Sequence, residues 1–385
     1  MKFFKPLSAL ILIILVSNLS SKEGEDYLDR LEVQGFIEVM HKKHGFIKED
    51  LLKLFATAKF QEKVIRIMNR QPEGIMTWTK YKEMMVSEDR IFSGKTFIES
   101  YKKELLRAED IYGVPAEIIA SIIGIETRYG RTQGNIRVLD SLMTLSFDYP
   151  RRAKFFKIQL EEFLLLAREE GLNTYQVKGS IAGAMGYGQF MPDSYRNYAV
   201  DFDFDGKRDI LHNPIDAIGS IANFLSKKGN WERNTAVAVK AELTGVRPDL
   251  KSSFKPYITV FELGALGIKP IVLMDSKKKV VPVELQLQLD EEQIKEKLLK
   301  EALKRNKFSL LLELGSLEMI FEPFEKIATL VAQKQYTEKP KESKYFEYWI
   351  GLQNYHALST YNRSKLYVMA VLEFSNSLEK FLTSK

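Results

Sequence analysis

The segment PAEIIASIIGIETRYG, residues 115–130, contains an apolar run that ends with one glutamate. Pro115 suits the first turn of a helix, where a missing N–H costs nothing. Ile119 and Ile122 precede Glu126 by seven and four residues, so the three side chains share one face of the predicted helix. The carboxylate of Glu126 is therefore expected to point into the protein or into a dry cleft.

Burial of a lone carboxyl disfavours its charged form and raises its pKa. A group that keeps its proton near neutral pH can serve as a general acid. The alternative is that Glu126 forms an ion pair with Arg128 or Arg131, or lies at the edge of the apolar stripe. Because structural ion pairs also perturb carboxylates, spacing alone leaves both interpretations open.

Composition sets limits on the class of protein. The chain has 385 residues, enough for two or three domains, and its 45% hydrophobic and 28% charged residues exclude a disordered chain. The net charge is +6, yet no basic run is interleaved with aromatic residues, so we predict no nucleic-acid partner. The absence of cysteine excludes disulfides and thiol catalysis.

The first residues predict export. Lys2 and Lys5 precede the apolar run LSALILIILV, residues 7–16, which is too short to span a bilayer comfortably. Residues 1–21 are therefore interpreted as a secretory signal peptide. Small residues do not fall cleanly at both positions before a cleavage site, so a retained N-terminal anchor is the alternative.

Periodicity predicts a mainly α protein. Apolar positions recur at three and four from about residue 23 to residue 170, and Gly171 is a natural helix stop. Residues 236–343 include alternating stretches such as YITVFEL and VELQLQL, typical of strands, and are expected to form a small α+β insertion. The segment from residue 345 to 382 is predicted to be helical.

The segment KGSIAGAMGYGQFMPDSY, residues 178–195, is rich in glycine. Because glycine permits close backbone approach, such a segment can wall a groove in which Ser180, Tyr187 and Gln189 meet a polar ligand. The alternative is close helix packing with a tight turn. The glycine spacing matches neither phosphate-binding pattern.

The segment DFDFDGKRDILHNPID, residues 201–216, resembles an EF-hand calcium loop. Positions one, three, five and six are Asp201, Asp203, Asp205 and Gly206. Three neighbouring carboxylates repel one another unless a cation intervenes, so we predict a structural Ca²⁺ site; a solvated acidic turn is the alternative.

The later positions of this loop follow the EF-hand pattern less closely. Lys207 would contribute its backbone carbonyl, as position seven does in an EF-hand. His212 stands at position twelve in place of glutamate, and Asp209 or Asp216 could supply the missing carboxylate. The histidines lack the spacing of a zinc site, and no organic cofactor is expected.

A fourth stretch, YWIGLQNYHALSTYNRSKLYVMAV, residues 348–371, is dense in aromatic and amide side chains. Carbohydrate sites combine both kinds of group, although an aromatic helix in a core looks the same. Taken in order, IIGIETRYGR and the stretches above resemble motifs of the membrane-bound lytic murein transglycosylase B family. The likeness covers about residues 35–235 and 345–375.

The resemblance implies an α-helical, lysozyme-like catalytic core with flanking domains. The implied division is a signal peptide at 1–21, an N-terminal helical region at 22–100, a lysozyme-like core with calcium loop at 101–235, the α+β insertion at 236–343 and the C-terminal helical part of the core at 344–385. It also implies a periplasmic location, with membrane association if the N-terminal anchor is retained.

By resemblance the protein is an enzyme that cleaves the β-1,4 bond between N-acetylmuramic acid and N-acetylglucosamine of peptidoglycan and leaves a 1,6-anhydromuramoyl end. Glu126 is the implied single acid/base. The implied substrate-binding residues are Ser180, Met185, Tyr187, Gln189, Tyr361 and Asn362. The implied calcium ligands are Asp201, Asp203, Asp205, Lys207 and Asp216. Partners are peptidoglycan glycan strands, with cell-wall synthesis or division proteins as further candidates.

The sequence departs from the family pattern at two positions: Phe204 stands where glycine is common, and Thr360 where arginine is frequent. Two other functions stay open. A hydrolytic lysozyme-type muramidase would use the same acid and let water attack, and a second carboxylate facing Glu126 would favour it. A non-catalytic murein-binding scaffold is the alternative from another class.

Overall fold

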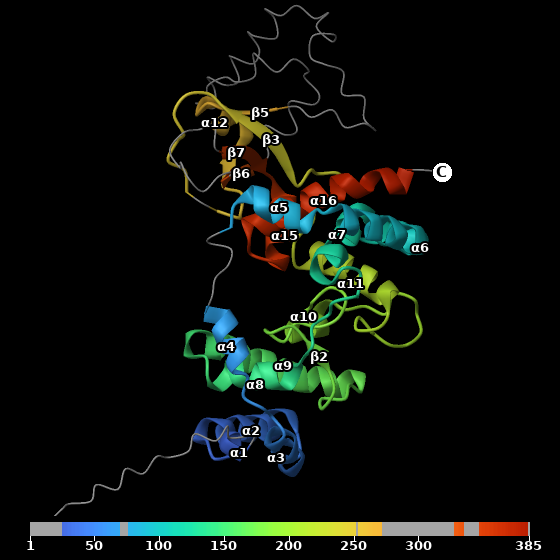
Figure 1. Cartoon of the computed structure of the whole chain (residues 1–385), viewed down its shortest axis with the longest axis vertical. Coiled ribbons are helices and arrows are strands. Elements are labelled where there is room, and N and C mark those ends of the chain that lie inside the picture. The colour runs from blue at the N-terminus through green and yellow to red at the C-terminus, as the bar shows by residue number, and fades with distance from the viewer. Residues whose placement is uncertain (1–24, 70–75, 252, 272–326, 335–345, 384–385) are drawn as a thin grey trace, which may run out of the picture. The chain divides into compact units, whose positions relative to one another are not determined.

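The computed structural model describes residues 25–69, 76–251, 253–271, 327–334 and 346–383 (Figure 1). The chain divides into two compact units at residues 61 and 62. The described residues are mainly helical, as predicted. In the described part no helix is both long and apolar enough to cross a membrane. The predicted signal peptide lies outside the described residues.

The first unit is a small cluster of three helices. They are α1 (Glu25–Leu28), α2 (Leu31–His44) and α3 (Lys48–Ala56). Helix α2 ends at Gly45, whose φ of 69° is left-handed and reverses the chain. Phe36 of α2 and Phe55 of α3 are buried with ring centroids 6.1 Å apart, so an aromatic pair joins these two helices.

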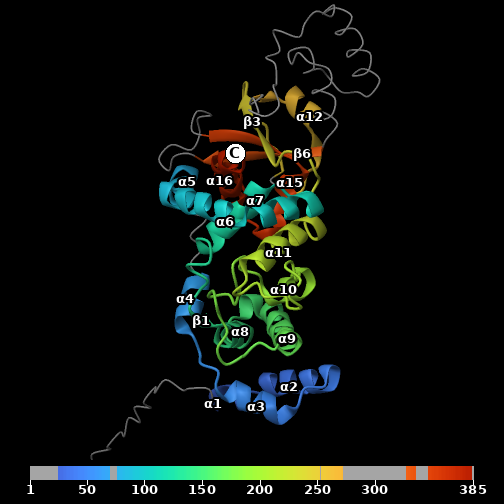
Figure 2. The same cartoon turned by 90° about the vertical axis from the view of Figure 1, so that its right-hand side faces the viewer.

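The central helix of the second unit is α7 (Ala116–Thr127). It packs against α6 (Glu88–Tyr112), α11 (Pro214–Lys227) and α16 (Lys365–Thr383) (Figures 1 and 2). All of its residues are buried except Glu117 and Glu126, which are partly exposed. A helix that is apolar around its whole circumference is a buried helix. The isoleucines are therefore part of a fully buried helix, and the prediction of one apolar face was too narrow.

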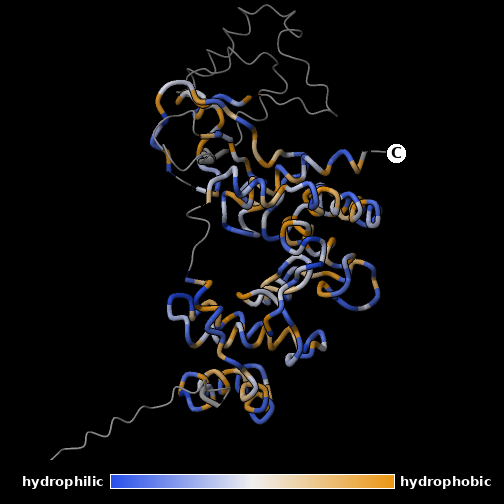
Figure 3. Tube along the Cα trace, in the orientation of Figure 1, coloured by the Kyte–Doolittle hydropathy of each residue, from blue (hydrophilic) through white to orange (hydrophobic). Residues whose placement is uncertain are grey.

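Further helices surround this core. They are α4 (Glu62–Asn69), α5 (Trp78–Met85), α8 (Val138–Phe147), the 3-10 helix Pro150–Arg152, α9 (Ala153–Glu170), α10 (Pro192–Tyr198) and α15 (Gln353–Tyr361). Helix α8 packs on α9, and α9 on α10. Apolar and polar residues alternate along α9 (Figure 3), and it ends at Gly171 as predicted. The predicted boundary between residues 100 and 101 falls within α6.

A five-stranded antiparallel sheet forms most of the small mixed region. Its order is β4 (Ile258–Thr259), β6 (Ile327–Lys334), β7 (Phe346–Gly351), β3 (Ala238–Leu243) and β5 (Ile268–Pro270). Helix α12 (Val260–Ala265) contributes Leu263 to the core of this region, together with Ile268 and Tyr348. Trp78 Nε1 donates to Glu347 Oε2 at 3.0 Å, which joins the sheet to α5.

Two expectations for this region were wrong. The segment from residue 345 begins with strand β7 instead of a helix, because its alternating aromatic residues pair with β3 and β6. The stretch YITVFEL is a strand for two residues and then becomes α12, since Thr259 and Glu262 form a capping box. The predicted strand VELQLQL lies outside the described residues.

Candidate active site

Glu126 lies in the last turn of α7. Part of the residue is accessible to solvent, while protein atoms surround its carboxyl. Burial raises the pKa of Glu126 to about 7, and the nearby Tyr367 hydroxyl opposes that shift. Within the described part of the chain, no other carboxylate acts on this pKa. Glu126 is therefore a single carboxylic acid that holds its proton up to neutral pH.

Two tyrosines stand beside this carboxyl. Tyr361 ends α15 and Tyr367 lies in α16, and their rings are stacked with centroids 6.5 Å apart. Burial and the charge of Glu126 raise the pKa of both hydroxyls, so both stay neutral. Tyr361 donates to the carbonyl of Gly188. The Tyr367 hydroxyl faces Glu126 without a hydrogen bond of ordinary geometry.

The end of α7 is tied to the glycine-rich segment. Thr127 Oγ1 donates to the carbonyl of Tyr187 at 2.9 Å and accepts from Gly130 N at 3.0 Å. Gly130 has φ of 86°, and a Cβ there would lie 2.3 Å from the ring of Tyr187. Only glycine permits this approach. The residues after Glu126 are thus held against the wall of the site.

Two of the predicted substrate-binding residues in the glycine-rich segment, Ser180 and Gln189, are hydrogen-bonded to the backbone of the protein. Ser180 Oγ accepts from the amides of Ala182 and Ala184 at 3.3 and 3.0 Å. Gln189 has a left-handed φ of 50°, and its Nε2 donates to the carbonyls of Gln133 and Gly186 at 3.0 Å each. Its side-chain carbonyl is thereby oriented.

Met185 was predicted to bind substrate, but the structure places it inside the protein. The residue is fully buried, and its backbone pairs with Phe190 through two hydrogen bonds of 2.9 Å. It offers no surface to a ligand, so it shapes the wall from inside. Tyr187 is partly exposed, and Asn362 is exposed just beyond the end of α15. Both are available to a ligand.

A pocket of about 210 Å³ lies beside these residues. Its lining is Phe155, Gln189, Phe190, Met191, Asp193, Ser194, Phe224, Lys228, Thr360 and Tyr361. Phe190, Phe224 and Tyr361 form an aromatic triangle with centroids 5.0 to 5.8 Å apart. Aromatic faces with a few polar groups at the rim are typical of a ligand site. Gln189 and Tyr361, both predicted to bind substrate, meet in this pocket.

The three aspartates of the predicted calcium loop converge. Carboxylate oxygens of Asp201, Asp203 and Asp205 all lie within 4.8 Å of one another. Phe204 and Gly206 have left-handed φ values of 65° and 90°, which curl the loop around these oxygens. Gly206 N donates to Asp201 Oδ2 at 2.8 Å. The phenylalanine that replaces the usual glycine therefore adopts a backbone conformation that glycine prefers.

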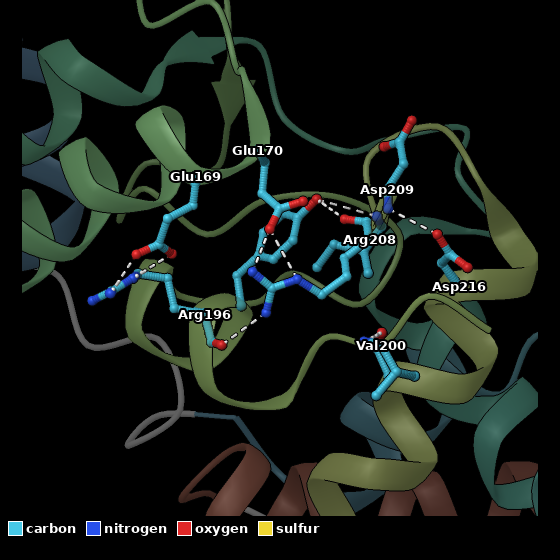
Figure 4. Close-up of polar contacts among 10 residues, drawn as sticks. Glu169, Glu170, Arg196, Val200, Arg208, Asp209 and Asp216 are labelled. Carbon is cyan, nitrogen blue, oxygen red and sulfur yellow. Dashed lines mark hydrogen bonds and ion pairs between the residues drawn. The ribbon is translucent and has the colours of Figure 1, made fainter. Parts of the chain in front are cut away.

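Asp216 is placed differently from the other predicted ligands. It is fully buried in the first turn of α11, where its two oxygens accept from Phe202 N at 2.7 Å and Asp209 N at 2.8 Å (Figure 4). Burial raises its pKa, and these hydrogen bonds oppose the shift. It does not join the cluster of three carboxylates. Asp216 therefore holds the loop through two backbone amides, and its role as a calcium ligand stays a prediction.

Ion pairs fix the flank of this loop. Arg208 pairs with Glu170 at the end of α9 and donates to the carbonyl of Arg196 at 3.1 Å (Figure 4). Arg196 in turn pairs with Glu169 and Glu162. The loop is thus anchored to α9 and α10 by charge pairs.

The chain matches the family described as Transglycosylase SLT domain over residues 29–313. It belongs to that family. It is 44% identical over 258 residues to the membrane-bound lytic murein transglycosylase B of Escherichia coli strain K12, which covers 64% of this chain and 70% of the relative. The mainly α, lysozyme-like fold and the predicted enzyme class are confirmed.

Two solved structures of the Escherichia coli lytic transglycosylase Slt35 are similar to this chain. One, in complex with bulgecin A, has a TM-score of 0.73 at 34% identity and covers 94% of this chain and 98% of the other. The second, in complex with calcium, has a TM-score of 0.71 at 34% identity and covers 94% and 97%.

Three residues in the region of Glu126 were not predicted from the sequence. Tyr367 lies only six residues after Tyr361 in the quoted aromatic stretch, so that stretch held a signal for it. Tyr81 of α5 is buried and acts on the pKa of Tyr367, yet nothing in its local sequence points to a site. Arg90 of α6 contacts the end of α7 from a distant part of the chain.

Proposed function

We propose that this protein cleaves the β-1,4 bond between N-acetylmuramic acid and N-acetylglucosamine and forms a 1,6-anhydromuramoyl end, with Glu126 as the single acid/base. As a member of its family the protein is a lytic transglycosylase of peptidoglycan. What we propose in addition is the bond that it cleaves, the anhydro product and the role of Glu126. The observation that carries it is one carboxyl with a pKa of about 7 and no second carboxylate acting on it. The mass of the released muropeptides tests it.

In the first step Glu126 donates its proton to the glycosidic oxygen as the bond to C1 of the muramoyl residue breaks. An acid with a pKa near the working pH suits this step. The 2-acetamido group of the sugar stabilises the positive charge that develops at C1, as in substrate-assisted glycosidases. The neutral hydroxyl of Tyr367 stands beside the carboxyl and adds no competing charge.

In the second step the Glu126 carboxylate takes the proton of the C6 hydroxyl. The C6 oxygen then bonds to C1 and closes the 1,6-anhydro ring. Glu126 ends protonated, as it began, and no water is consumed. This sequence needs one carboxylate, whereas hydrolysis by retaining or inverting glycosidases needs two. No second carboxylate of the described residues is among the groups that shift the pKa of Glu126, which supports the intramolecular attack over a muramidase.

The glycan would lie along the wall made by Ser180, Tyr187 and Gln189 and across the Tyr361 ring toward Asn362. Of the aromatic triangle, the partly exposed Tyr361 offers a ring face to a sugar, with Phe190 and Phe224 buried behind it, and the oriented carbonyl of Gln189 can accept from a sugar hydroxyl or amide. Met185 supports this wall without touching the glycan. Partners among cell-wall synthesis or division proteins stay a prediction, as does the periplasmic location.

Calcium fits the loop at residues 201–216. Asp201, Asp203 and Asp205 supply converging hard oxygen ligands, and the backbone carbonyl of Lys207 would complete the arrangement. The similar Slt35 protein has been solved with calcium. The ion would neutralise three carboxylates and hold the loop, and it takes part in no step of the reaction. Asp216 would stabilise the same loop through backbone amides.

Removal of calcium is expected to lower stability more than it changes the chemistry. A ligand at 100 times its Kd stabilises the native state by about 2.7 kcal/mol, which corresponds to about 4 °C for a unit that spans residues 62–385. Differential scanning calorimetry with and without EGTA measures the shift. Asp201→Asn is expected to abolish it, whereas a melting curve of the wild type that is the same with and without Ca²⁺ would refute the site.

Activity is expected to fall as the pH rises through about 7. Burial raises the pKa of Glu126 above its ordinary value, so the protonated acid is present below pH 7 and is lost above it. The profile of kcat/KM against pH for soluble glycan strands measures this limb. A rate that stays constant up to pH 9 would contradict the role of Glu126 as the acid.

A further inference from the structure

Arg90 is a buried cation whose presence needs a reason. It lies in the first turn of α6 and is only 8% exposed. Arginine keeps its charge at physiological pH. Among the described residues it has no carboxylate at ion-pair distance, and its Nε has no hydrogen-bond partner. Burial lowers its pKa, and the charge of Arg128 lowers it further. A buried charge without a counter-ion is costly.

The contacts of Arg90 lead to the helix that carries Glu126. Its Nη1 donates to the carbonyl of Gly124 at 2.7 Å and to that of Ile125 at 3.3 Å. These carbonyls belong to the last turn of α7, where the helix dipole favours a cation. The Gly124 carbonyl also accepts from Arg128 N at 3.1 Å. Ile125 immediately precedes Glu126. The guanidinium of Arg90 is therefore hydrogen-bonded to the helical turn that carries the carboxyl of Glu126.

The chain reverses abruptly after this turn. Arg128 and Tyr129 have left-handed φ values of 50° and 60°, and Gly130 follows at 86°. Such conformations cost non-glycine residues about 1–2 kcal/mol each, so surrounding contacts must hold them. The turn that carries Glu126 is thus a strained helix end that needs support from outside α7.

One face of α6 provides that support. Arg90, Gly94 and Phe97 are spaced by four and three residues and so share a helical face. The Tyr129 ring lies 5.0 Å from Phe97, and its hydroxyl would be 2.5 Å from a Cβ at Gly94. Arg90 adds two hydrogen bonds to this close packing.

We propose that Arg90 is a positioning residue for Glu126: it fixes the last turn of α7 so that the carboxyl projects into the site. The inference rests on the proposed role of Glu126. Burial raises the pKa of Glu126 and the Tyr367 hydroxyl opposes that shift, and Arg90 is not among the groups that act on it. Loss of Arg90 therefore changes where the carboxyl lies and leaves its acidity unchanged.

The test compares Arg90→Ala and Arg90→Lys with Arg196→Ala, which removes a cation whose two ion pairs join α10 to α9. For Arg90→Ala we expect kcat per folded molecule to fall about 10- to 100-fold, with KM changed by less than about twofold. The pH at which activity declines stays the same. Added methylguanidinium restores part of kcat, because it can occupy the vacated site.

Arg90→Lys keeps a charge but lacks the planar fork, so it is expected to lose less kcat than Arg90→Ala. Arg196→Ala should melt at a lower temperature with unchanged kcat and no response to methylguanidinium. If Arg90→Ala does not fold, Arg90→Lys decides. A folded Arg90 variant with the wild-type kcat would overturn the inference, as would a loss that follows the folded fraction alone and is not rescued.

Glu126→Gln is measured in parallel to separate two failures. If Glu126→Gln retains activity, the proposed acid is wrong, whatever the Arg90 variants do. If Glu126→Gln is inactive while folded Arg90→Ala has the wild-type kcat, only the positioning role of Arg90 fails.

Discussion

Glu126→Gln is expected to lower the rate of peptidoglycan cleavage by at least about 10³-fold, since general acid–base catalysis contributes about 10²–10⁴-fold and the same residue serves both steps. The amide is nearly isosteric but can neither donate the proton to the glycosidic oxygen nor take that of the C6 hydroxyl. Release of soluble muropeptides from purified sacculi measures the rate. Binding of the variant to sacculi should persist.

A matched control lies on the same helix. Glu117 in the first turn of α7 is also partly exposed, and Glu117→Gln is expected to keep the wild-type rate. Residual activity of Glu126→Gln within tenfold of the wild type would remove Glu126 from the central role. Rates that fall equally in both variants would point to damage to α7 instead.

The same substitution has a predicted effect on stability. The folded-state pKa of Glu126 is raised from 4.5 to about 7, so its stabilising contribution is full below pH 4.5 and is lost as the pH rises through 7. Glu126→Gln removes this dependence. The variant should therefore match the wild type near pH 4 and exceed its free energy of unfolding at pH 8 by about 2–4 kcal/mol. Urea unfolding at both pH values measures the difference and also shows that the variant folds.

Gly134→Ala is expected to destabilise the protein by more than about 4 kcal/mol or to prevent folding. Gly134 has φ of 97°, and a Cβ there would lie 2.0 Å from the carbonyl oxygen of Gly179 and 2.6 Å from Ser180 N. Both are backbone atoms that cannot rotate away. The segment that carries Ser180 would have to move, and with it the wall of the site.

Gly171→Ala is a control that separates the steric clash expected for Gly134→Ala from the cost of a left-handed φ. Gly171 also has a left-handed φ, of 65°, but nothing lies within 4 Å of a Cβ built there. Its substitution should cost only the conformational penalty, about 1–2 kcal/mol. Urea unfolding of both variants gives the two free energies. Equal losses for Gly134→Ala and Gly171→Ala would show that close approach to Gly179 is unimportant.

Local sequence predicted those parts of the site that are local in the chain. The apolar run before Glu126 indicates a buried carboxyl, because a helix with isoleucines around its circumference is buried in the protein core. The alternating aspartates and Gly206 indicate the cation loop, since its ligands lie within a few residues of one another. The glycines of residues 178–195 indicate close backbone approach.

What sequence could not show depends on tertiary contacts. Tyr81 and Arg90 reach the Glu126 region from α5 and α6, and no local pattern marks them. Met185 and Tyr187 are two residues apart, yet one is fully buried and the other partly exposed because the segment is an irregular loop without a period. Asp216 was predicted as the carboxylate missing at position twelve of the loop, and only its position in α11 shows that its oxygens accept from two backbone amides.

The most direct test of the central claim is mass spectrometry of the muropeptides released from sacculi by the purified protein. Intramolecular attack by the C6 hydroxyl predicts products one water lighter than their hydrolysed counterparts, with no incorporation of ¹⁸O when the reaction runs in labelled water. Products at the hydrolysed mass that carry ¹⁸O at the new end would contradict the single-carboxylate mechanism and require a group that activates water.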